Sequence, residues 1–474
     1  MQNVVHHYRL AACGLLSLLA IWGCRKPDPV QPPNSTAQVP LRVIVVDDAP
    51  LAATMQREWL AHTENQLEVA SVTAEQAATA QQLPADVVIY PPGLVGQFAA
   101  SDLILPLDEQ QLSTPEFARD DIDPLLRSQL TTWGRRTVAV PLGSPQLVLF
   151  YRADLLAQHK LEPPQTWEEY QALVDKFQAK PAEVTTADDN WQATAEPLAA
   201  GWAAELLLAR AASAAVHRDQ LSPLFTLENC DPLITGPPWV RACEQLVAAH
   251  SKAGDTLLTP ADCYAKFQAG ECALAITWPM LLTEAPPSML KPEQIGLALL
   301  PGSREMFNPE SQAWESLRDG ESLHVPVLGS SGKLASVTRA SPQPRAATQF
   351  LLWLSGPRMS GRIAAHSAET TPFRTSHFRD AGPWQPPQPV ALLPQYGELL
   401  LAEQSQPRRL ISPRIPGRKE YLAALDRAVL AAVMKETSPT DALTTAGDEW
   451  QKITATRGAD SQQRALRRSL GLID

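Results

Sequence analysis

The sequence predicts an α/β fold built as two domains. Its first part alternates short apolar runs, rich in β-branched residues, with longer segments that are compatible with helices. This alternation is typical of a βαβ layer. The runs are apolar throughout, as expected for strands of a parallel sheet that are buried on both faces. With 474 residues the chain is longer than one core of ordinary size needs, so two domains are expected.

Three of the expected strands lie near the start of the chain. They are LRVIVVD at 41–47, LEVASV at 67–72 and DVVIYPP at 86–92. In open α/β sheets, ligands sit outside the carboxyl ends of the strands. This rule directs attention to Asp47 and Asp48 after the first strand and to Tyr90 at the end of the third. Capping of the next helix is the alternative role for the two acids.

The next group of elements surrounds a short polar interruption. Apolar strands are expected at 138–142 and 147–152, and the residues GSPQ at 143–146 between them favour a change of direction. Further along, Thr166 and Glu169 have the spacing of a capping box. The residues after them place their apolar side chains on one face, which predicts a helix.

The first 40 residues have the pattern of an export signal followed by a tether. An uncharged apolar run, too short to span a bilayer, ends at Gly23 directly before Cys24. This arrangement resembles the bacterial lipobox, in which the cysteine becomes the lipidated N-terminus, although Trp22 stands where a small residue is usual. We expect a lipoprotein signal peptide at 1–23 and a proline-rich tether at 24–40. An uncleaved signal, ordinary signal-peptidase cleavage and an apolar core helix are the alternatives.

Further motifs follow in a fixed order along the chain. They are SPQLVLFYRADLLAQHKLEPPQTWEE at 144–169, PADCYAKFQAGECALAITWPMLL at 260–282, IGLALLPG at 295–302, the stretch from SSGKLASV to TPFR at 330–374, and SPTDALTTAGDEW at 438–450. Together they resemble the family 1 extracellular solute-binding proteins, which are the maltose-binding-like receptors of ABC importers. The resemblance extends from about residue 41 to residue 453, and the last stretch resembles the usual last helix of that family.

The resemblance implies a two-lobed periplasmic-binding-protein fold, type II-like, with a hinge and a ligand cleft between the lobes. The implied boundaries are 41–142 plus 326–370 for lobe 1 and 143–325 plus 371–474 for lobe 2. The resemblance does not account for the segments 307–323 and 383–394.

The resemblance, together with the strand-end rule that selected Asp47 and Asp48, gives a set of candidate ligand-binding residues. An uncharged sugar needs planar apolar faces for its ring and hydrogen-bonding groups for its hydroxyls. Aromatic residues near strand ends and helix starts, together with polar residues at the crossover, supply both kinds of group. Core packing, surface exposure or capping is the alternative role for each of them. The candidates are Trp278, Tyr90, Trp202, Asp47, Asp48, Ser144, Gln146 and Arg374.

Four cysteines follow the signal region, namely Cys230, Cys243, Cys263 and Cys272. An exported chain with four cysteines can form two disulfides, and their spacing lacks the CxxC knuckle of a structural zinc site. We therefore expect two disulfides and no metal. The pairing of Cys230 with Cys243 and of Cys263 with Cys272 is slightly favoured over crossed pairs, and free buried thiols are the alternative.

Several classes of function are disfavoured. The chain has neither GxSxG nor HExxH, and GSSGKL at 329–334 lacks the first glycine of a P-loop. The net charge of −11 disfavours binding to nucleic acid. We expect a monomeric, lipid-anchored receptor on the extracytoplasmic face that uses no cofactor. It would capture a small solute, a mono- or oligosaccharide, by hinge closure and hand it to ABC permease subunits. A ligand-sensing subunit of a signalling system and a surface carbohydrate-active enzyme are the alternatives.

Overall fold

The computed structural model describes residues 40–63, 66–184, 190–251, 256–280, 288–364, 366–379, 392–404 and 406–474. The expected signal peptide, Cys24 and the tether up to Val39 lie outside these residues, as does most of the proline-rich segment 383–394. Across the described ranges, no helix has both the length and the apolar character that crossing a membrane requires.

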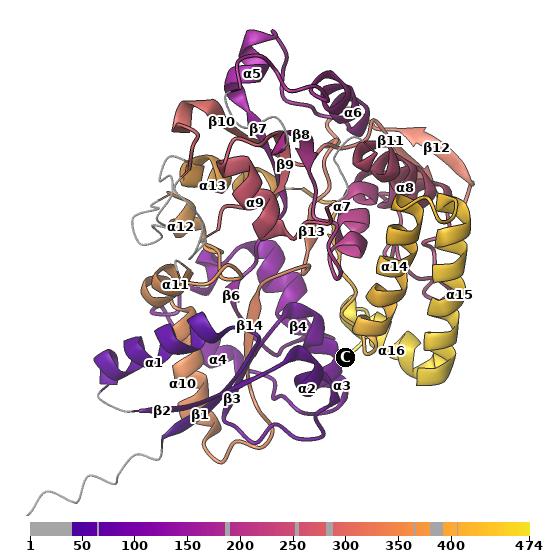
Figure 1. Ribbon diagram of the computed structural model, residues 1–474. Helices are drawn as coiled ribbons and strands as arrows, with labels where there is room; N and C mark the ends of the chain where they lie inside the picture. The colour runs from indigo at the N-terminus through magenta and orange to yellow at the C-terminus, as the bar shows by residue number, and fades with distance from the viewer. Residues whose placement is uncertain are drawn as a thin grey trace, which may run out of the picture. The chain divides into compact units, whose positions relative to one another are not determined.

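The first lobe is built on a five-stranded sheet with the order β2-β1-β3-β14-β6 (Figure 1). Strand β1 is parallel to both β2 and β3, whereas β14 is antiparallel to β3 and β6. The strands are β1 (Leu41–Val46), β2 (Leu67–Val72), β3 (Val87–Tyr90), β6 (Val140–Gly143) and β14 (Lys333–Val337). The predicted βαβ layer is therefore confirmed, and a strand from much later in the chain completes it.

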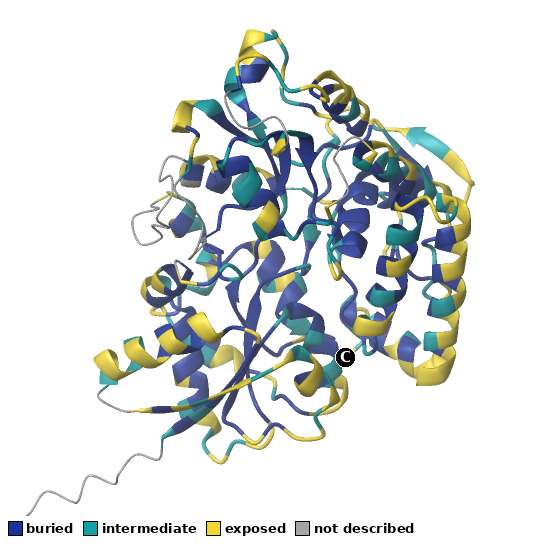
Figure 2. Ribbon diagram, viewed as in Figure 1, coloured by how far each residue is buried: buried dark blue, intermediate teal, exposed yellow. Residues whose placement is uncertain are grey.

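Helices cover both faces of this sheet. Because strand side chains alternate between faces, Val43 and Val45 of β1 pack in one core with α1 and α10. Ile44 and Val46 pack in another core with α2 and α3. Figure 2 shows β1, β3 and β14 as largely buried, while the outer sides of the helices are exposed. The helices are α1 (Ala49–Thr63), α2 (Ala74–Thr79), α3 (Val95–Ala100) and α10 (Pro344–Ser355).

The second lobe is built on a four-stranded sheet with the order β10-β7-β9-β8. Its strands are β7 (Val148–Arg152), β8 (Gln192–Ala195), β9 (Cys272–Thr277) and β10 (Ile295–Ala298). Helices α9 and α13 pack on one face, and α6, α7 and α8 belong to the core on the other face. These helices are α6 (Trp167–Lys176), α7 (Ala203–Ala215), α8 (Pro237–His250), α9 (Pro260–Gln268) and α13 (Leu392–Gln404).

The helix expected after Thr166 is confirmed as α6, and the capping differs in one detail. The Thr166 hydroxyl accepts a hydrogen bond from the Glu169 amide at 3.3 Å. The Glu169 carboxylate, however, accepts a hydrogen bond from the amide of Gln165, one residue before the cap, at 2.8 Å. Both bonds satisfy amides at the start of the helix, so the prediction of the helix start was correct.

The polar interruption at 143–146 carries the chain from the first sheet to the second. Strand β6 ends at Gly143 in the first sheet, and β7 begins at Val148 in the second. A Cβ atom at Gly143 would lie 2.4 Å from the Cα atom of Thr370, so the neighbouring backbone leaves room only for glycine. The predicted change of direction is thus a crossover between the lobes.

The segment 307–323, which the resemblance left unexplained, contains most of a β-hairpin. Strands β11 (Glu305–Asn308) and β12 (Ala313–Ser316) pair antiparallel, and β11 packs against α7 and α8. The guanidinium carbon of Arg241 lies 3.4 Å from the ring centroid of Trp314, a cation–π contact. The insertion is therefore packed onto the helices of the second lobe.

The C-terminal helices contact both lobes. Helices α14 (Arg418–Val433) and α15 (Pro439–Arg457) pack against α7 and α8 of the second lobe. Helix α15 contains the stretch that resembles the family's last helix, but α16 (Ala459–Ser469) follows it. Helix α16 contacts α3 and the short strand β4 (Thr132–Trp133) of the first lobe. Helix α16 thus forms a link between the lobes in addition to the chain crossovers.

The four cysteines are free thiols, so the predicted disulfides are wrong. Cys230 and Cys243 lie in the core of α7 and α8, and Cys263 and Cys272 lie in the core of α9. Burial raises the pKa of Cys230 to about 11 and the pKa values of Cys243 and Cys272 to about 12. The thiols pack as small apolar groups in these cores, and as neutral thiols they are poorly reactive.

Candidate functional site

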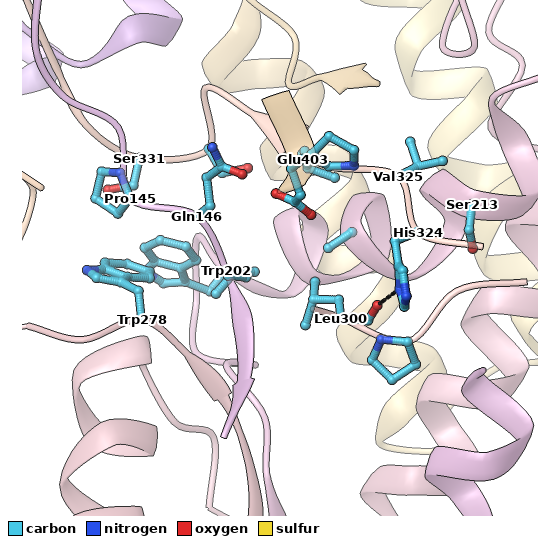
Figure 3. A pocket seen from close by; sticks show the side chains of 16 residues that line it. Pro145, Gln146, Trp202, Ser213, Trp278, Leu300, His324, Val325, Ser331 and Glu403 are labelled. Carbon is cyan, nitrogen blue, oxygen red and sulfur yellow. Dashed lines mark hydrogen bonds between the residues drawn. The ribbon is translucent and has the colours of Figure 1, made fainter. Parts of the chain in front are cut away.

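A small cavity lies where the crossover between the lobes meets α7 and the end of β9 (Figure 3). Its lining includes Gln146, Trp202, Trp278, His324 and Glu403. The cavity volume is about 20 Å³, which is roughly the space that one water molecule occupies. Ser330 and Ser331, which lie just before β14 of the first sheet, also line the cavity, so residues of both lobes meet there, although the space between them is narrow in this conformation.

Two tryptophans form one end of this cavity. Trp202 lies directly before α7, and Trp278 directly follows β9. Their ring centroids are 5.5 Å apart and their planes are tilted by 43° (Figure 3). Trp278 is 3% exposed and its indole nitrogen donates a hydrogen bond to the Ala368 carbonyl at 3.0 Å. Trp202 is only partly buried, so it is the more accessible of the two planar faces.

Two titratable residues, Glu403 and His324, line the cavity among the described residues, and both are uncharged near neutral pH. Burial, together with repulsion by Asp123, raises the pKa of Glu403 to about 8, so its carboxyl is mostly protonated. Burial lowers the pKa of His324, whose Nδ1 lies 2.6 Å from the Leu300 carbonyl oxygen. A neutral imidazole makes this contact as a donor through Nδ1–H. The cavity thus offers polar groups without a fixed charge.

Buried polar atoms at the cavity lack hydrogen-bond partners. Within the described part of the chain, Gln146 Oε1 and Ser213 Oγ line the cavity and are unpaired, and Ser144 Oγ, two residues before Gln146, is also unpaired. Leaving a buried polar atom unpaired costs about 1–3 kcal/mol. A ligand hydroxyl that paired with these atoms would recover part of that cost. In Figure 3, the Glu403 carboxyl and the Gln146 amide lie on the same side of the cavity.

Three of the predicted ligand-binding residues, Gln146, Trp202 and Trp278, line this cavity, and Ser144 lies beside it. Tyr90 does not line it: its side chain is fully buried at the end of β3, with its hydroxyl 2.7 Å from that of Ser336. It packs edge to face on Phe98, in the core beneath α3.

The two acids after β1 serve neighbouring helices. One carboxylate oxygen of Asp48 accepts a hydrogen bond from the Leu51 amide at 3.0 Å in the first turn of α1, and the other accepts one from the Ser367 hydroxyl at 2.6 Å. The carboxylate of Asp47 accepts a hydrogen bond from the Ala74 amide at 2.9 Å, at the start of α2. These contacts are of the kind that the capping alternative describes, and neither acid lines the cavity.

Arg374 also lies away from the cavity. Its guanidinium is buried and donates hydrogen bonds to the carbonyl oxygens of Ser355, Phe117 and Ala118 at 2.7–3.1 Å. Its Nη1 lies 3.6 Å from a carboxylate oxygen of Asp121. This arginine thus joins the end of α10 to the segment 117–121 of the first lobe.

Sequence reasoning missed Glu403, His324 and Ser213. Glu403 follows the leucine-rich run of α13, where an acid reads as a solvent-exposed helix residue, and Ser213 stands in an alanine-rich helix. His324 follows the inserted hairpin. No local pattern distinguishes these positions, because each reaches the cavity only through the packing of elements that are distant in sequence.

The two sheets, the crossover between them and the cavity beside it are the features of a two-lobed binding protein. The chain belongs to the family of bacterial extracellular solute-binding proteins, whose family model matches residues 48–359. This match confirms the resemblance inferred from the motifs, and the family's description as extracellular implies a location outside the cytoplasm. No curated protein matches the sequence.

Solved structures with the same fold include several transport proteins. An ABC transporter solute-binding protein from Agrobacterium radiobacter in complex with ribitol is 18% identical, with a TM-score of 0.65, over 88% of this chain and 98% of that one. One from Agrobacterium vitis with bound D-mannitol is 18% identical, with a TM-score of 0.64, over 88% and 99%. The sugar-binding protein MalE from Xanthomonas citri is 17% identical, with a TM-score of 0.65, over 88% and 98%. At these identities the likeness shows the two-lobed α/β fold.

Proposed function

We propose that this protein is a lipid-anchored receptor that captures a small uncharged solute, a sugar or polyol, and delivers it to the permease of an ABC importer. The observation that carries the proposal is the cavity at the crossover, which combines two tryptophan rings with polar groups that have no fixed charge. Sugars and polyols need both kinds of surface. The neighbours with ribitol and D-mannitol, 18% identical to this chain, support the same class of ligand.

The individual groups fit this class of ligand. The face of Trp202 suits the C–H side of a sugar ring or polyol chain, as aromatic faces do in apolar contacts. Gln146 Oε1 and Ser213 Oγ are unpaired acceptors for ligand hydroxyls. The protonated Glu403 carboxyl has one donor as well as acceptors. A charged solute would find no counter-charge among the described residues that line the cavity.

Binding requires a change of conformation. The cavity of about 20 Å³ is far smaller than the roughly 300–1,000 Å³ typical of small-molecule sites. We propose that the lobes separate about the crossover to admit the solute and close again on it. Binding then shifts the equilibrium between open and closed states by the difference in affinity of the two states. The permease would recognise the closed state of a monomeric receptor.

A thermal-shift screen tests this function. The purified chain is heated with sugars, polyols, amino acids and polyamines, and hits are measured by calorimetry. A ligand that binds only the native state raises the melting temperature by mass action. We expect hits among the sugars or polyols. A clear hit with a polyamine or an amino acid, and none with any sugar or polyol, would overturn the proposed ligand class.

A further inference from the structure

A larger cavity of about 300 Å³ lies apart from the tryptophans. It is enclosed by the loop that follows α7, the segment 407–415 and helix α16, and Gln129 of the first lobe also lines it. Its volume reaches the lower end of the range typical of small-molecule sites. The segment 407–415 and α16 lie beyond residues 48–359, the part of the chain that the family model matches.

Cationic side chains dominate the charge of this cavity. Arg218, Arg408, Arg409 and Arg414 line it together with His217, and the described residues of its lining include no aspartate or glutamate. The whole chain, by contrast, has a net charge of −11. The cavity is therefore a local concentration of positive charge on an acidic protein, a feature that raises the local concentration of anions.

Among the described residues, only Arg218 of these four arginines forms ion pairs with acids. Arg218 forms ion pairs with Glu315 at 2.6 Å and with Glu321 at 2.7 Å. No ion pair with Arg408, Arg409 or Arg414 occurs in the described ranges. Burial lowers the pKa of Arg408. Attraction by Glu321 acts against this shift, and repulsion by Arg218 adds to it.

In the described part of the chain, the hydrogen bonds of Arg408, Arg409 and Arg414 are with backbone carbonyl oxygens. Arg408 donates hydrogen bonds to the carbonyls of Ser213, Val216 and Ser322. Arg409 contacts the carbonyl of Pro407 at 3.2 Å. Arg414 donates to the carbonyls of Leu130 and Ser469. Carbonyl oxygens orient a guanidinium but do not neutralise it.

Arg414 is a buried cation, and not all of its hydrogen-bond donors are satisfied within the described ranges. It is 4% exposed, and its Nε has no hydrogen-bond partner among the described residues. Burial lowers its pKa to about 10, and the hydroxyl of Tyr90 is the titratable group that acts against this shift. A buried cation that has no counter-ion destabilises the fold, and an anion that pairs with it reduces this cost.

The rest of the lining is apolar. Phe225, Leu466 and Leu470 form part of the wall. Leu221 and Leu472 also line the cavity, and they are 62% and 37% exposed, so their apolar side chains are accessible to an occupant. An occupant with both an anionic group and an apolar part would match both kinds of surface.

We propose that this cavity binds a small organic anion, whose carboxylate or phosphate group pairs with Arg409 and Arg414 and whose apolar part contacts the leucines. The site is separate from the tryptophan-lined cavity and shares none of its lining residues. It therefore does not depend on the proposed sugar or polyol ligand.

Calorimetry on the full chain tests the proposal with octanoate and hexyl phosphate as probes and 1-hexanol as the neutral match. We expect binding of at least one of the two anions and none of the alcohol, with an affinity that falls as sodium chloride is raised, because salt screens accessible charge pairs. The proposal is overturned if neither anion binds or if hexanol binds as tightly as the anions.

Variants of Arg409 locate the site. This arginine is only partly buried and has no ion pair among the described residues, so its replacement leaves the core intact. Arg409→Gln should weaken anion binding about tenfold, and Arg409→Lys should retain most of it. Arg345→Gln, which removes an exposed arginine outside the cavity, is the charge-matched control and should bind as the parent does. Equal affinities of parent and Arg409→Gln would overturn the proposal.

Discussion

Trp202 and Trp278 share one end of the cavity but differ in how much of the fold depends on them. Trp278 is buried in the core of α9 and α13 and its indole N–H is hydrogen-bonded, whereas Trp202 packs at the edge of that core. A residue that both packs in a core and lines a cavity contributes to stability and to binding. One that only lines the cavity contributes mainly to binding.

Replacing each tryptophan by alanine should separate these contributions. Trp202→Ala should weaken sugar or polyol binding roughly tenfold through the lost stacking face. Its melting temperature should change little. Trp278→Ala should lose about 3–5 kcal/mol of unfolding free energy, as large core deletions do. Calorimetric affinity and melting temperature without ligand are the paired measurements.

Trp353 offers a control for this pair, because it is a partly buried tryptophan on α10 that stacks with His62 and does not line the cavity. Trp353→Ala should leave affinity unchanged. If Trp202→Ala melts far below the parent yet binds normally when folded, the role of Trp202 in the cavity is wrong. A Trp278→Ala protein with normal melting would contradict its role in the core.

Glu403 makes stability depend on pH. Its carboxyl has an ordinary pKa of 4.5 in the unfolded chain and about 8 in the folded one, so the folded state binds more protons between these values. The stability that comes from the protonated carboxyl is complete below about pH 4.5 and is lost as pH rises through about 8. The largest possible loss is on the order of 5 kcal/mol.

The variant Glu403→Gln should remove this dependence, because glutamine stays neutral at every pH. We expect parent and variant to unfold at similar urea concentrations at pH 5, and the variant to be more stable at pH 9. Glu398→Gln, which changes an exposed acid on the same helix, is the matched control and should follow the parent. Identical pH profiles of parent and Glu403→Gln would show that Glu403 is not held neutral in the fold.

Strand β8 and helices α6 and α7 are joined by a buried ion pair. Glu196 directly follows β8, and both of its carboxylate oxygens accept hydrogen bonds from Nη2 of Arg210 on α7, at 2.7 and 2.9 Å. The Tyr170 hydroxyl on α6 donates a third hydrogen bond to Glu196 at 2.7 Å. The Arg210 guanidinium also lies 4.1 Å from the centroid of Trp167. The two charges are 1% and 2% exposed, so neither is screened by water.

Removing one partner of this pair should therefore destabilise the second lobe strongly. Glu196→Ala would leave Arg210 as an uncompensated buried cation, at a cost of about 3–5 kcal/mol. The control is Glu449→Ala, which breaks the ion pair of Arg427 and Glu449 on α14 and α15, in which Arg427 is mostly exposed and Glu449 about one-third exposed. That change should cost less than about 1 kcal/mol. Urea unfolding curves of the two variants measure the difference, and equal losses would contradict the argument.

The two lobes are linked by more than the crossovers. Glu205 of α7 is 2% exposed and accepts hydrogen bonds from the hydroxyls of Ser330 and Ser412 at 2.7 Å each. It also pairs with Arg418 at the start of α14, at 2.6 Å. A Cβ atom at Gly93 in the first lobe would lie 2.2 Å from the Arg418 side chain, so that side chain packs directly on the loop after β3. The proposed opening of the lobes would rearrange these contacts around Glu205 and Arg418.

Export and anchoring concern the whole molecule. If the chain is processed at Cys24 and lipidated there, Cys24→Ser should release soluble protein from the membrane fraction. Fractionation of cells that express the parent and the variant, with detection of the C-terminal part of the chain, measures this. A Cys24→Ser protein that stays membrane-bound and uncleaved would show that the lipobox interpretation is wrong.

The sequence by itself was sufficient to predict the α/β class, the crossover at 143–146, the helix after Thr166 and the family. These features depend on local patterns, such as apolar runs, caps and turn residues, and on the order of motifs along the chain. The resemblance to the family also singled out Gln146, Trp202 and Trp278, and the structure places all three in the lining of the cavity.

Only the tertiary structure decided the state of the cysteines and the surroundings of the charged residues. Cys263 and Cys272 are thiols in a core, the carboxylates of Asp47 and Asp48 cap helices, and Glu403 lines the cavity. The partners that settle these roles are often far away in sequence, as for Asp48 and Ser367, which are 319 residues apart. Burial and hydrogen bonding follow from which elements pack together, and a local pattern of residues does not contain that information.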